Sequence, residues 1–585
     1  MSLRKCGQLV REKWQLTFIM GMVVGFVAFL VIYGVDVLRF TNVSWLTDSQ
    51  SLEGLWDLTQ HYNGWLYYRQ TPWTFPIGMT QGICPEDISV AYTDAIPLFA
   101  IIFKIFSPIL PTAFQYFGLF ELLTYMLMGG FGALTTYKYS KNIIFNSISA
   151  GLFVVSPVLI KRTFYHTALS AHFLILIAIC LWIYREEISY RKFVSYWTLL
   201  AVLCVLINPY YVPMVYGILL LSVIQRIIAT KEWKRIILLI ICPIIGAVLI
   251  GWIIGLFAGS QSSAGDSLEL VSYNLNQLYN PADPILIHEP KRPMPIGEVH
   301  NYSKFLEPLD VHVGWQTEGF AYLGFGIIIM FIVAVVNGIF YLEKNINKEN
   351  KRYYISLIVS VIIGVVVFTF LAMGPVGTYG ASELYHIYWP KPIYNLLAMF
   401  RTCGRLIWPV YYGIYTIILI IFARTIKGSK AIWVILLACT ILQLLDISPS
   451  ITYKHNIYTN IGVGQENKEN PLLTSERMKE LASDHTQIVF LPETKLKICI
   501  CANWSCKFQQ YALENDMKMS AAYCSRDVSA LADEYANSII ERKRKGESFS
   551  DVIFVALFKD DAERFSDLNL DWFEIDDVYI GVEKR

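Results

Sequence analysis

Residues 16–35 read LTFIMGMVVGFVAFLVIYGV, a run of twenty residues without a charged side chain. An α-helix rises about 1.5 Å per residue, so this run is long enough to cross a hydrocarbon core of roughly 30 Å. A cleaved signal peptide has a shorter apolar region of roughly 7–15 residues and then a small-residue cleavage site. Here Tyr33, Asp36 and Arg39 occur instead, and we therefore expect an uncleaved spanning helix.

The composition of the whole chain extends this expectation. Of 585 residues, 55% are hydrophobic and 16% are charged, and the mean hydropathy is +0.44. These values indicate a polytopic α-helical membrane protein. The net charge of +1 gives no reason to expect nucleic acid as a partner, because binding to phosphate backbones needs clustered Lys and Arg.

Ten further segments are apolar over a length suited to spanning. A spanning segment must satisfy its backbone hydrogen bonds internally, which favours helices in spite of many β-branched residues. We predict about eleven transmembrane helices in residues 1–447. Besides the first, they are Thr112–Thr136, Ile144–Ile160, Ala168–Tyr184, Phe193–Ile207, Tyr211–Ile228, Ile236–Phe257, Ala321–Leu342, Tyr353–Met373, Leu406–Ala423 and Ala431–Ile447.

Lys and Arg residues gather in alternate connections between these segments. Because cytoplasmic connections are enriched in Lys and Arg, the pattern predicts a multi-pass protein of the plasma membrane with a cytoplasmic N-terminus. The basic connections after the N-terminal one are residues 138–141, 185–192, 226–235, 344–352 and 424–430.

The segment Ala95–Leu110, AIPLFAIIFKIFSPIL, is apolar but short, and it contains Lys104. If it spanned the membrane, every later basic connection would lie outside, so we expect an interfacial or re-entrant helix. The outer parts are then the first outer loop, residues 37–111, the loop at 258–320 and a tail at 448–585.

The tail differs in composition from the rest of the chain. QIVFLP (487–492) and DVIFVALF (551–558) are typical of buried strands, whereas residues 476–483 and 535–545 are typical of helices. We predict a soluble α/β domain over residues 448–585, and an odd number of spans makes it extracytoplasmic.

Four cysteines in this tail, Cys499, Cys501, Cys506 and Cys524, could form disulfides outside the cell. A zinc site at CICANWSC (499–506) is the alternative, although its spacing matches no common zinc pattern.

The first outer loop contains three candidate catalytic residues. Asp57 and His61 lie in WDLTQHYNGW (56–65), among aromatic residues, and Asp94 lies in AYTDAIPLF (91–99). A carboxylate beside apolar surface is partly desolvated, which raises its pKa and suits it to proton abstraction. The alternatives are an aromatic belt with incidental polar residues and, for either Asp, a helix N-cap.

Further polar residues lie near the outer ends of spans. Taken singly, an interfacial Arg can snorkel and a His can be structural. Together they suit a lipid-linked phosphate, because Arg offers forked donors to its oxygens while a carboxylate can activate an acceptor hydroxyl. These candidate substrate-binding residues are Glu121, Arg162, His166, Glu318, Arg401 and Arg405.

Several stretches carry a resemblance to a known superfamily. They are WDLTQHYNGWLYYRQTPWTFPIG (56–78), AYTDAIPLFAIIFK (91–104), SPVLIKRTFYHTALSAHFLIL (156–176), INPYYV (207–212), EGFAYLG (318–324) and FRTCGRLIWPVYY (400–412). With them the chain resembles a bacterial membrane-protein family of the GT-C superfamily, the integral-membrane glycosyltransferases that use polyprenyl-phosphate-linked sugars.

The resemblance implies roles for individual residues. Asp57 takes the place of the acidic residue in the first outer loop, as general base or as the group that orients the acceptor. Many relatives have two adjacent acids there, whereas Asp57 lies between Trp56 and Leu58, so Asp94 is the alternative base. Arg401 and Arg405 would bind the donor phosphate, helped by His166 or Arg162.

The resemblance also implies the reaction: an inverting sugar transfer on the outer face, from a polyprenyl-phosphate sugar to a cell-envelope glycan, lipid or protein. The sequence contains no glycine-rich nucleotide-binding loop or convincing metal cluster, but some relatives use a divalent cation such as Mg or Mn, which leaves that cofactor open. A transporter or flippase of lipid-linked saccharides is the first alternative; it should have polar groups near the midplane, whereas here they lie at the outer face. A non-catalytic envelope scaffold is the second.

Overall fold

The structure is a computed structural model that describes residues 3–47, 56–230, 236–259, 268–282, 301–347, 350–399, 402–426, 429–459, 473–493, 502–525, 528–575 and 578–584. Within these ranges, nine helices are long and apolar enough to cross a membrane. This is consistent with a polytopic membrane protein. The nine lie in α1 (Leu3–Tyr33), α5 (Phe117–Tyr137), η5 with α8 (Thr167–Leu169, Phe173–Tyr184), α9 (Tyr190–Ile207), α10 (Tyr211–Thr230), α11 (Ile236–Ile253), α13 (Phe325–Asn345), α14 (Lys351–Met373) and η8 with α16 (Gly404–Ile407, Trp408–Thr425).

The number of spans differs from the predicted eleven at two places. The predicted span at 144–160 is broken into α6 (Ile143–Val154) and α7 (Pro157–Arg162). Pro157 has no N–H to donate, and it drives Ser156 into an extended conformation with ψ of 132°.

The second difference concerns the last predicted span. It is α17 (Lys430–Asp446), which is followed after a 50° bend by α18 (Ser448–Thr459). If the bent pair is taken as one span, the described residues contain up to ten.

Helices α1 and α5 pack at very short range through glycines. A Cβ atom added to Gly21 would lie 2.3 Å from the carbonyl oxygen of Gly129, and one added to Gly25 would lie 2.1 Å from that of Tyr125. Small residues four apart let two backbones approach closely inside a membrane, where van der Waals contact drives helix association. The first apolar run is therefore bound to the rest of the bundle rather than standing apart.

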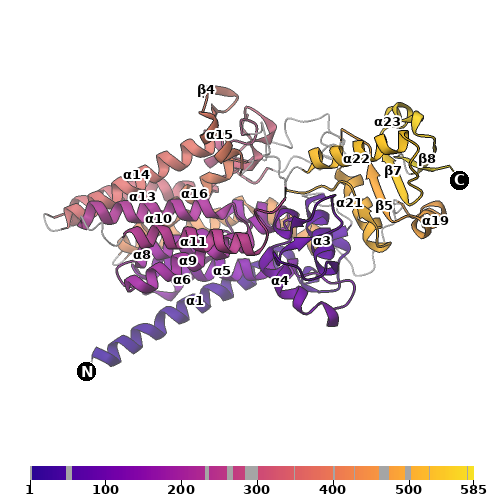
Figure 1. Ribbon diagram of the computed structural model, residues 1–585. Coiled ribbons are helices and arrows are strands. Elements are labelled where there is room, and N and C mark those ends of the chain that lie inside the picture. The colour runs from indigo at the N-terminus through magenta and orange to yellow at the C-terminus, as the bar shows by residue number, and fades with distance from the viewer. Residues whose placement is uncertain are drawn as a thin grey trace.

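The first outer loop folds into short elements at the end of the bundle opposite the N-terminus (Figure 1). They are η1 (Asp36–Leu38), α2 (Ser44–Thr47), α3 (Trp56–Gln70), the hairpin β1–β2 (Met79–Thr80, Ile88–Ser89), η3 (Val90–Thr93), α4 (Pro97–Ile105) and η4 (Ser107–Ile109). Helix α4 has nine residues, which is too short to cross a membrane. This agrees with the prediction that the segment 95–110 is not a span.

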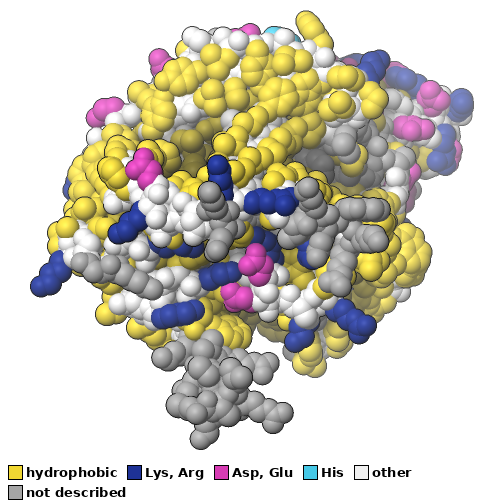
Figure 2. Space-filling view, turned by 90° about the vertical axis from the view of Figure 1, so that its left-hand side faces the viewer, with side chains coloured by type: hydrophobic (Ala, Val, Ile, Leu, Met, Phe, Trp, Pro, Cys, Tyr) yellow, Lys and Arg dark blue, Asp and Glu magenta, His cyan; other side chains and the backbone are white. Residues whose placement is uncertain are grey.

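Two other connections reach the same end of the bundle. One contains η6 (Leu275–Leu278) and η7 (Gly314–Gly319), and the other contains the antiparallel hairpin β3–β4 (Val376–Tyr379, Ser382–His386) and α15 (Lys391–Ala398). The opposite end, turned to the viewer in Figure 2, presents Lys and Arg side chains beside hydrophobic surface. The cytoplasmic location of this end stays a prediction.

The C-terminal part contains a five-stranded sheet in the order β6-β5-β7-β9-β8. Strand β5 pairs in parallel with β6 and β7, whereas β9 pairs antiparallel with β7 and β8. Its strands are β5 (Gln487–Phe490), β6 (Lys518–Met519), β7 (Val552–Ala556), β8 (Leu570–Ile575) and β9 (Val578–Glu583), and its helices are α19 (Glu476–Asp484), α21 (Ala502–Glu514), α22 (Ser529–Arg544) and α23 (Lys559–Arg564). The two predicted strands are β5 and β7, and the two predicted helices are α19 and α22.

This C-terminal part is docked on the first outer loop. Asn63 of α3 donates to the carbonyl oxygen of Cys506 and to Gln509 Oε1, both at 3.0 Å. Ser525 Oγ donates to the carbonyl oxygen of Tyr92 at 2.8 Å. Helix α21 therefore contacts α3, the helix that carries Asp57.

The disulfide prediction stays open. Cys506 and Cys524 are buried, whereas Cys499 and Cys501 lie outside the described residues.

Candidate functional site

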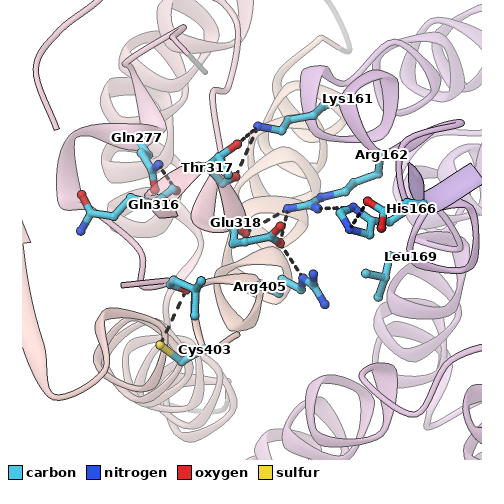
Figure 3. Close-up of polar contacts among 12 residues, drawn as sticks. Lys161, Arg162, His166, Leu169, Gln277, Gln316, Thr317, Glu318, Cys403 and Arg405 are labelled. Carbon is cyan, nitrogen blue, oxygen red and sulfur yellow. Dashed lines mark hydrogen bonds and ion pairs between the residues drawn. The ribbon is translucent and has the colours of Figure 1, made fainter. Parts of the chain in front are cut away.

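The centre of the candidate site is Glu318, on η7, between two arginines that come from distant parts of the chain (Figure 3). Arg162 Nη2 and Arg405 Nε both donate to Glu318 Oε2, at 2.9 and 2.8 Å. The side chains are 1%, 7% and 8% exposed for Arg162, Arg405 and Glu318. Charges this deeply buried are tolerated only when they are paired and hydrogen-bonded.

The break before Pro157 explains how Arg162 reaches this position. Helix α7 ends at Arg162, and both Lys161 and Arg162 in its last turn are buried. Arg162 also donates to the carbonyl oxygen of Glu318 at 3.1 Å, and Lys161 donates to Thr317 Oγ1. Two consecutive basic residues thus bind two consecutive residues of η7.

Buried amides hold η7 in place from the other side. Gln316 donates to Thr378 Oγ1 at 2.8 Å and to Ser272 Oγ at 3.2 Å, and it accepts from Asn274 Nδ2 at 3.0 Å. The position of the neighbouring Glu318 is therefore determined by side chains from its own connection and from the connection that contains β3.

The two arginines determine the charge of Glu318. Burial alone would raise the pKa of this carboxyl, but Arg162 and Arg405 hold it well below its usual range. Glu318 is accordingly ionised at any pH near neutrality, and the three side chains together carry one net positive charge.

Arg405 has donor capacity left over. It contacts Glu318 through Nε, and its guanidinium lies over the ring of Tyr210, 4.7 Å from the centroid. In the described part of the chain, no hydrogen bond is formed by its two terminal nitrogens. A guanidinium that is stacked on an aromatic ring in this way is suited to form two hydrogen bonds to a phosphate through its terminal nitrogens.

His166 connects Arg162 to Asp57. Arg162 Nη1 lies 3.2 Å from His166 Nδ1, and because a guanidinium only donates, Nδ1 must accept. Burial lowers the pKa of His166 well below its usual value, so the ring is neutral and carries its hydrogen on Nε2. That atom lies 3.3 Å from Asp57 Oδ2, so the neutral ring is in close contact with the Asp57 carboxyl.

Asp57 ends this series of contacts in an environment unlike that of Glu318. It lies in the first turn of α3, and its other oxygen, Oδ1, accepts from the hydroxyl of Tyr523 at 3.3 Å. Burial and the charge of Asp94 raise the pKa of Asp57 to about 7, and the Tyr523 hydrogen bond opposes that rise. Its side chain remains 18% exposed. We call the series Arg405, Glu318, Arg162, His166, Asp57 and Tyr523 the polar chain.

Asp94 belongs to the surroundings of the polar chain. It follows η3 with a φ of 54°, in the left-handed region, and Asn208 Nδ2 lies 3.3 Å from its Oδ1. The N-cap alternative is wrong for Asp94, because α4 begins at Pro97 after Ile96. Its charge raises the pKa of Asp57, which places the two carboxylates within electrostatic range.

His61 lies on α3 but is enclosed among apolar groups. Its ring is stacked on Phe117 with centroids 6.3 Å apart, and burial lowers its pKa to about 3. Neither of its ring nitrogens has a hydrogen-bond partner in the described structure. His61 is therefore a neutral buried ring outside the polar chain.

Of the two remaining predicted residues, the structure describes only Glu121, which is not part of the polar chain. Glu121 accepts from Ser170 Oγ at 2.7 Å and from the backbone N–H of Phe164 at 3.4 Å, which satisfies it locally inside the bundle. Arg401 lies outside the described residues.

A family described as "Domain of unknown function (DUF6311)" matches residues 22–448, well over half of the chain. The chain belongs to the DUF6311 family. No curated protein matches it. Of the polar chain of this DUF6311 protein, Tyr523 alone lies outside the matched residues.

The sequence of the DUF6311 chain offered no signal for Tyr523, because it lies in a tail whose docking could not be foreseen. Tyr210 and Asn208 lie in INPYYV, a stretch that the resemblance includes, but neither was predicted as a site residue.

A metal site is not formed by the described part of the DUF6311 chain: it contains no group of three or more His, Cys, Asp or Glu side chains suited to hold an ion. The positive charges described at the site are those of Arg162 and Arg405.

Proposed function

We propose that this protein is an inverting glycosyltransferase of the membrane, which transfers a sugar from a polyprenyl-phosphate-linked donor to a hydroxyl of a cell-envelope acceptor on the outer face. The observation that carries the proposal is the environment of Asp57. It is a partly exposed carboxylate with a raised pKa, which accepts from the Tyr523 hydroxyl and lies beside His166 and two paired arginines.

In the proposed step, ionised Asp57 takes the proton of the acceptor hydroxyl. The acceptor oxygen then forms a bond to the anomeric carbon, while the bond from that carbon to the phosphate oxygen of the donor breaks. The lipid phosphate leaves with the bonding electron pair, and the configuration at the carbon inverts. A base with a pKa of about 7 is matched to this task near neutral pH.

Each neighbour of Asp57 has a part in this proposal. Tyr523 donates to one carboxylate oxygen, and His166 Nε2 lies 3.3 Å from the other; together they would orient the base. Arg405 donates to Glu318 through Nε. Its two terminal nitrogens would donate to the donor phosphate and stabilise the negative charge that develops there.

The test is a transfer assay with purified full-length protein, a set of polyprenyl-phosphate sugars and candidate acceptors. We expect Asp57→Asn to lower the rate by about 10²–10⁴-fold, the usual contribution of a general base. Asp87→Asn is the matched control, because Asp87 lies in the same loop, is exposed and accepts from Gln81 Nε2 at 3.0 Å. It should keep the wild-type rate.

Two outcomes would count against the proposal in different ways. Equal rates for wild type and Asp57→Asn would remove the role of Asp57, and loss of activity in Asp94→Asn alone would assign the base to Asp94. An absence of transfer with every donor, together with movement of lipid-linked sugar across vesicles, would favour the transporter alternative.

A further inference from the structure

A crevice of about 380 Å³ lies in the membrane part, between α8, α10, α13, α14 and α16. It follows α16 from Pro409 to Arg424, a distance of about 22 Å at 1.5 Å per residue. That is more than half of a hydrocarbon core of roughly 30 Å. Ile, Leu and Val side chains make up most of the crevice lining. Its length and its apolar lining suit a long hydrocarbon chain.

The space beside Gly413 is empty, unlike that at a packed helix interface. A Cβ atom added to Gly413, halfway along the lining on α16, would meet no atom within 4 Å. By contrast, a Cβ added to Gly217 on α10 would lie 2.4 Å from Phe368. Helix interfaces are normally packed without voids, and in a membrane an apolar space of this size is filled by lipid.

One end of the crevice is basic and aromatic. Arg424 donates to the hydroxyl of Tyr341, and its guanidinium lies 4.7 Å from the ring centroid of Tyr139. Arg185 donates to the carbonyl oxygen of Trp182 at 2.8 Å. Both arginines line the crevice.

These two arginines are poorly neutralised by the residues that the structure describes. Arg185 contacts Glu186 at 3.4 Å, and the Glu186 side chain is 64% exposed; Arg424 forms no ion pair in the same ranges. An exposed pair of that kind contributes little. The end of the crevice therefore holds forked donors that suit an anion.

This end lies on the side of the bundle away from the polar chain. Helix α16 follows η8, which carries Arg405, and runs to Thr425, so Arg424 lies one helix length from Arg405. The Lys and Arg side chains of the end face near the N-terminus are visible in Figure 2.

We propose that the crevice binds a phospholipid of the leaflet at the N-terminal end. One acyl chain lies along α16 past Gly413, and the phosphate accepts hydrogen bonds from Arg185 and Arg424. The apolar lining selects the chain, and the two guanidiniums select an anionic headgroup. This proposal stands independently of the proposed sugar transfer.

The test uses delipidated full-length protein in detergent and three probes: phosphatidylglycerol, diacylglycerol with the same chains, and a polyprenyl phosphate. Binding is measured by native mass spectrometry. We expect phosphatidylglycerol to bind at least tenfold more tightly than diacylglycerol, and Arg424→Gln with Arg185→Gln to abolish that preference while leaving diacylglycerol binding unchanged. We expect Gly413→Leu to weaken both glycerolipids about tenfold.

Two control variants match these changes. Arg191→Gln removes an exposed basic residue on α9 that is not part of the lining, and Val434→Phe adds bulk to an exposed position on α17. Both should bind like wild type. The proposal is overturned if Gly413→Leu binds phosphatidylglycerol like wild type, if the arginine variant keeps its preference, or if the polyprenyl phosphate binds more tightly than phosphatidylglycerol at this crevice.

Discussion

Glu318 is a buried carboxylate and Asp57 a partly buried one in the same polar chain, and they differ in the charge of their partners. Glu318 accepts from two guanidiniums, which hold its pKa well below the usual range. Asp57 accepts from the Tyr523 hydroxyl and lies beside the neutral imidazole of His166, and its pKa rises to about 7. Burial acts on both in the same direction; the partners decide whether a carboxylate is a permanent counter-ion or a group that exchanges protons near neutral pH.

The largest expected effect comes from breaking the Glu318 end. Glu318→Gln leaves Arg162 and Arg405 buried without a counter-ion, and we expect a loss of about 3–5 kcal/mol in the free energy of unfolding. Denaturant unfolding in detergent measures it. Glu547→Gln, which disrupts the exposed pair with Arg542, should leave the midpoint unchanged. Equal denaturant midpoints for the two variants would mean that Glu318 is not needed to neutralise the buried arginines.

The Asp57 end should instead give a stability that depends on pH. In the folded protein its pKa is about 7, above the ordinary value of 3.8, so between these two values the folded state holds a proton that the unfolded state has released. The free energy of unfolding should therefore fall as pH rises through this window, and the loss should be complete above about pH 7.

Comparison with Asp57→Asn isolates that effect, because the amide does not titrate. The free energy of unfolding of the variant, relative to wild type, should rise by on the order of 2 kcal/mol between pH 4 and pH 8. The full effect of the pKa shift is larger, but the partial exposure of Asp57 reduces it. Thermal unfolding at the two pH values measures the gain. A difference that does not change with pH would mean that Asp57 is ionised in the folded protein throughout.

Tyr523→Phe tests how the C-terminal part of the chain affects the pKa of Asp57. The Tyr523 hydroxyl favours the ionised form of Asp57, so its removal should move the midpoint of the rate–pH profile upward from about pH 7. At pH 7 the rate should fall about two- to fivefold and recover at higher pH. Tyr511→Phe, whose hydroxyl bonds to the carbonyl oxygen of Met478, is the control. A loss that persists at high pH would make Tyr523 a structural contact only.

Asp94→Asn gives the smallest expected effect and the opposite sign. The charge of Asp94 raises the pKa of Asp57, so the variant should move the same midpoint downward. Because Asp57 is about half ionised at pH 7, the gain in rate there cannot exceed about twofold. A large loss in rate would instead identify Asp94 as the base.

Hydropathy and charge patterning predicted most of the helices, because a spanning segment must be apolar over a fixed length whatever surrounds it. The same reasoning joined residues 144–160 into one span, although the Ser156–Pro157 pair inside it marks a break. The tail strands β5 and β7 were predicted because buried strands read as continuous apolar runs.

The candidate site was predicted only as a set of residue types at one face. Arg162 and Glu318 are 156 positions apart, and Asp57 and Tyr523 are 466 apart; no local pattern encodes such a contact. His61 shows the converse error. Its position in an aromatic, polar stretch resembled a reactive site, but the side of α3 on which it lies faces Phe117.

The broken helix before Arg162 has a consequence for how this protein is made. Arg162 is synthesised 156 residues before its counter-ion Glu318, which is about 8–30 s at roughly 5–20 residues per second. A continuous span would hold an uncompensated guanidinium near the lipid for that interval. The short α7 instead ends at the same end of the bundle as the first outer loop, where Arg162 would be able to extend its guanidinium toward water before η7 is made. Assembly of this site is thereby deferred to the last third of insertion, when η8 supplies Arg405 as well.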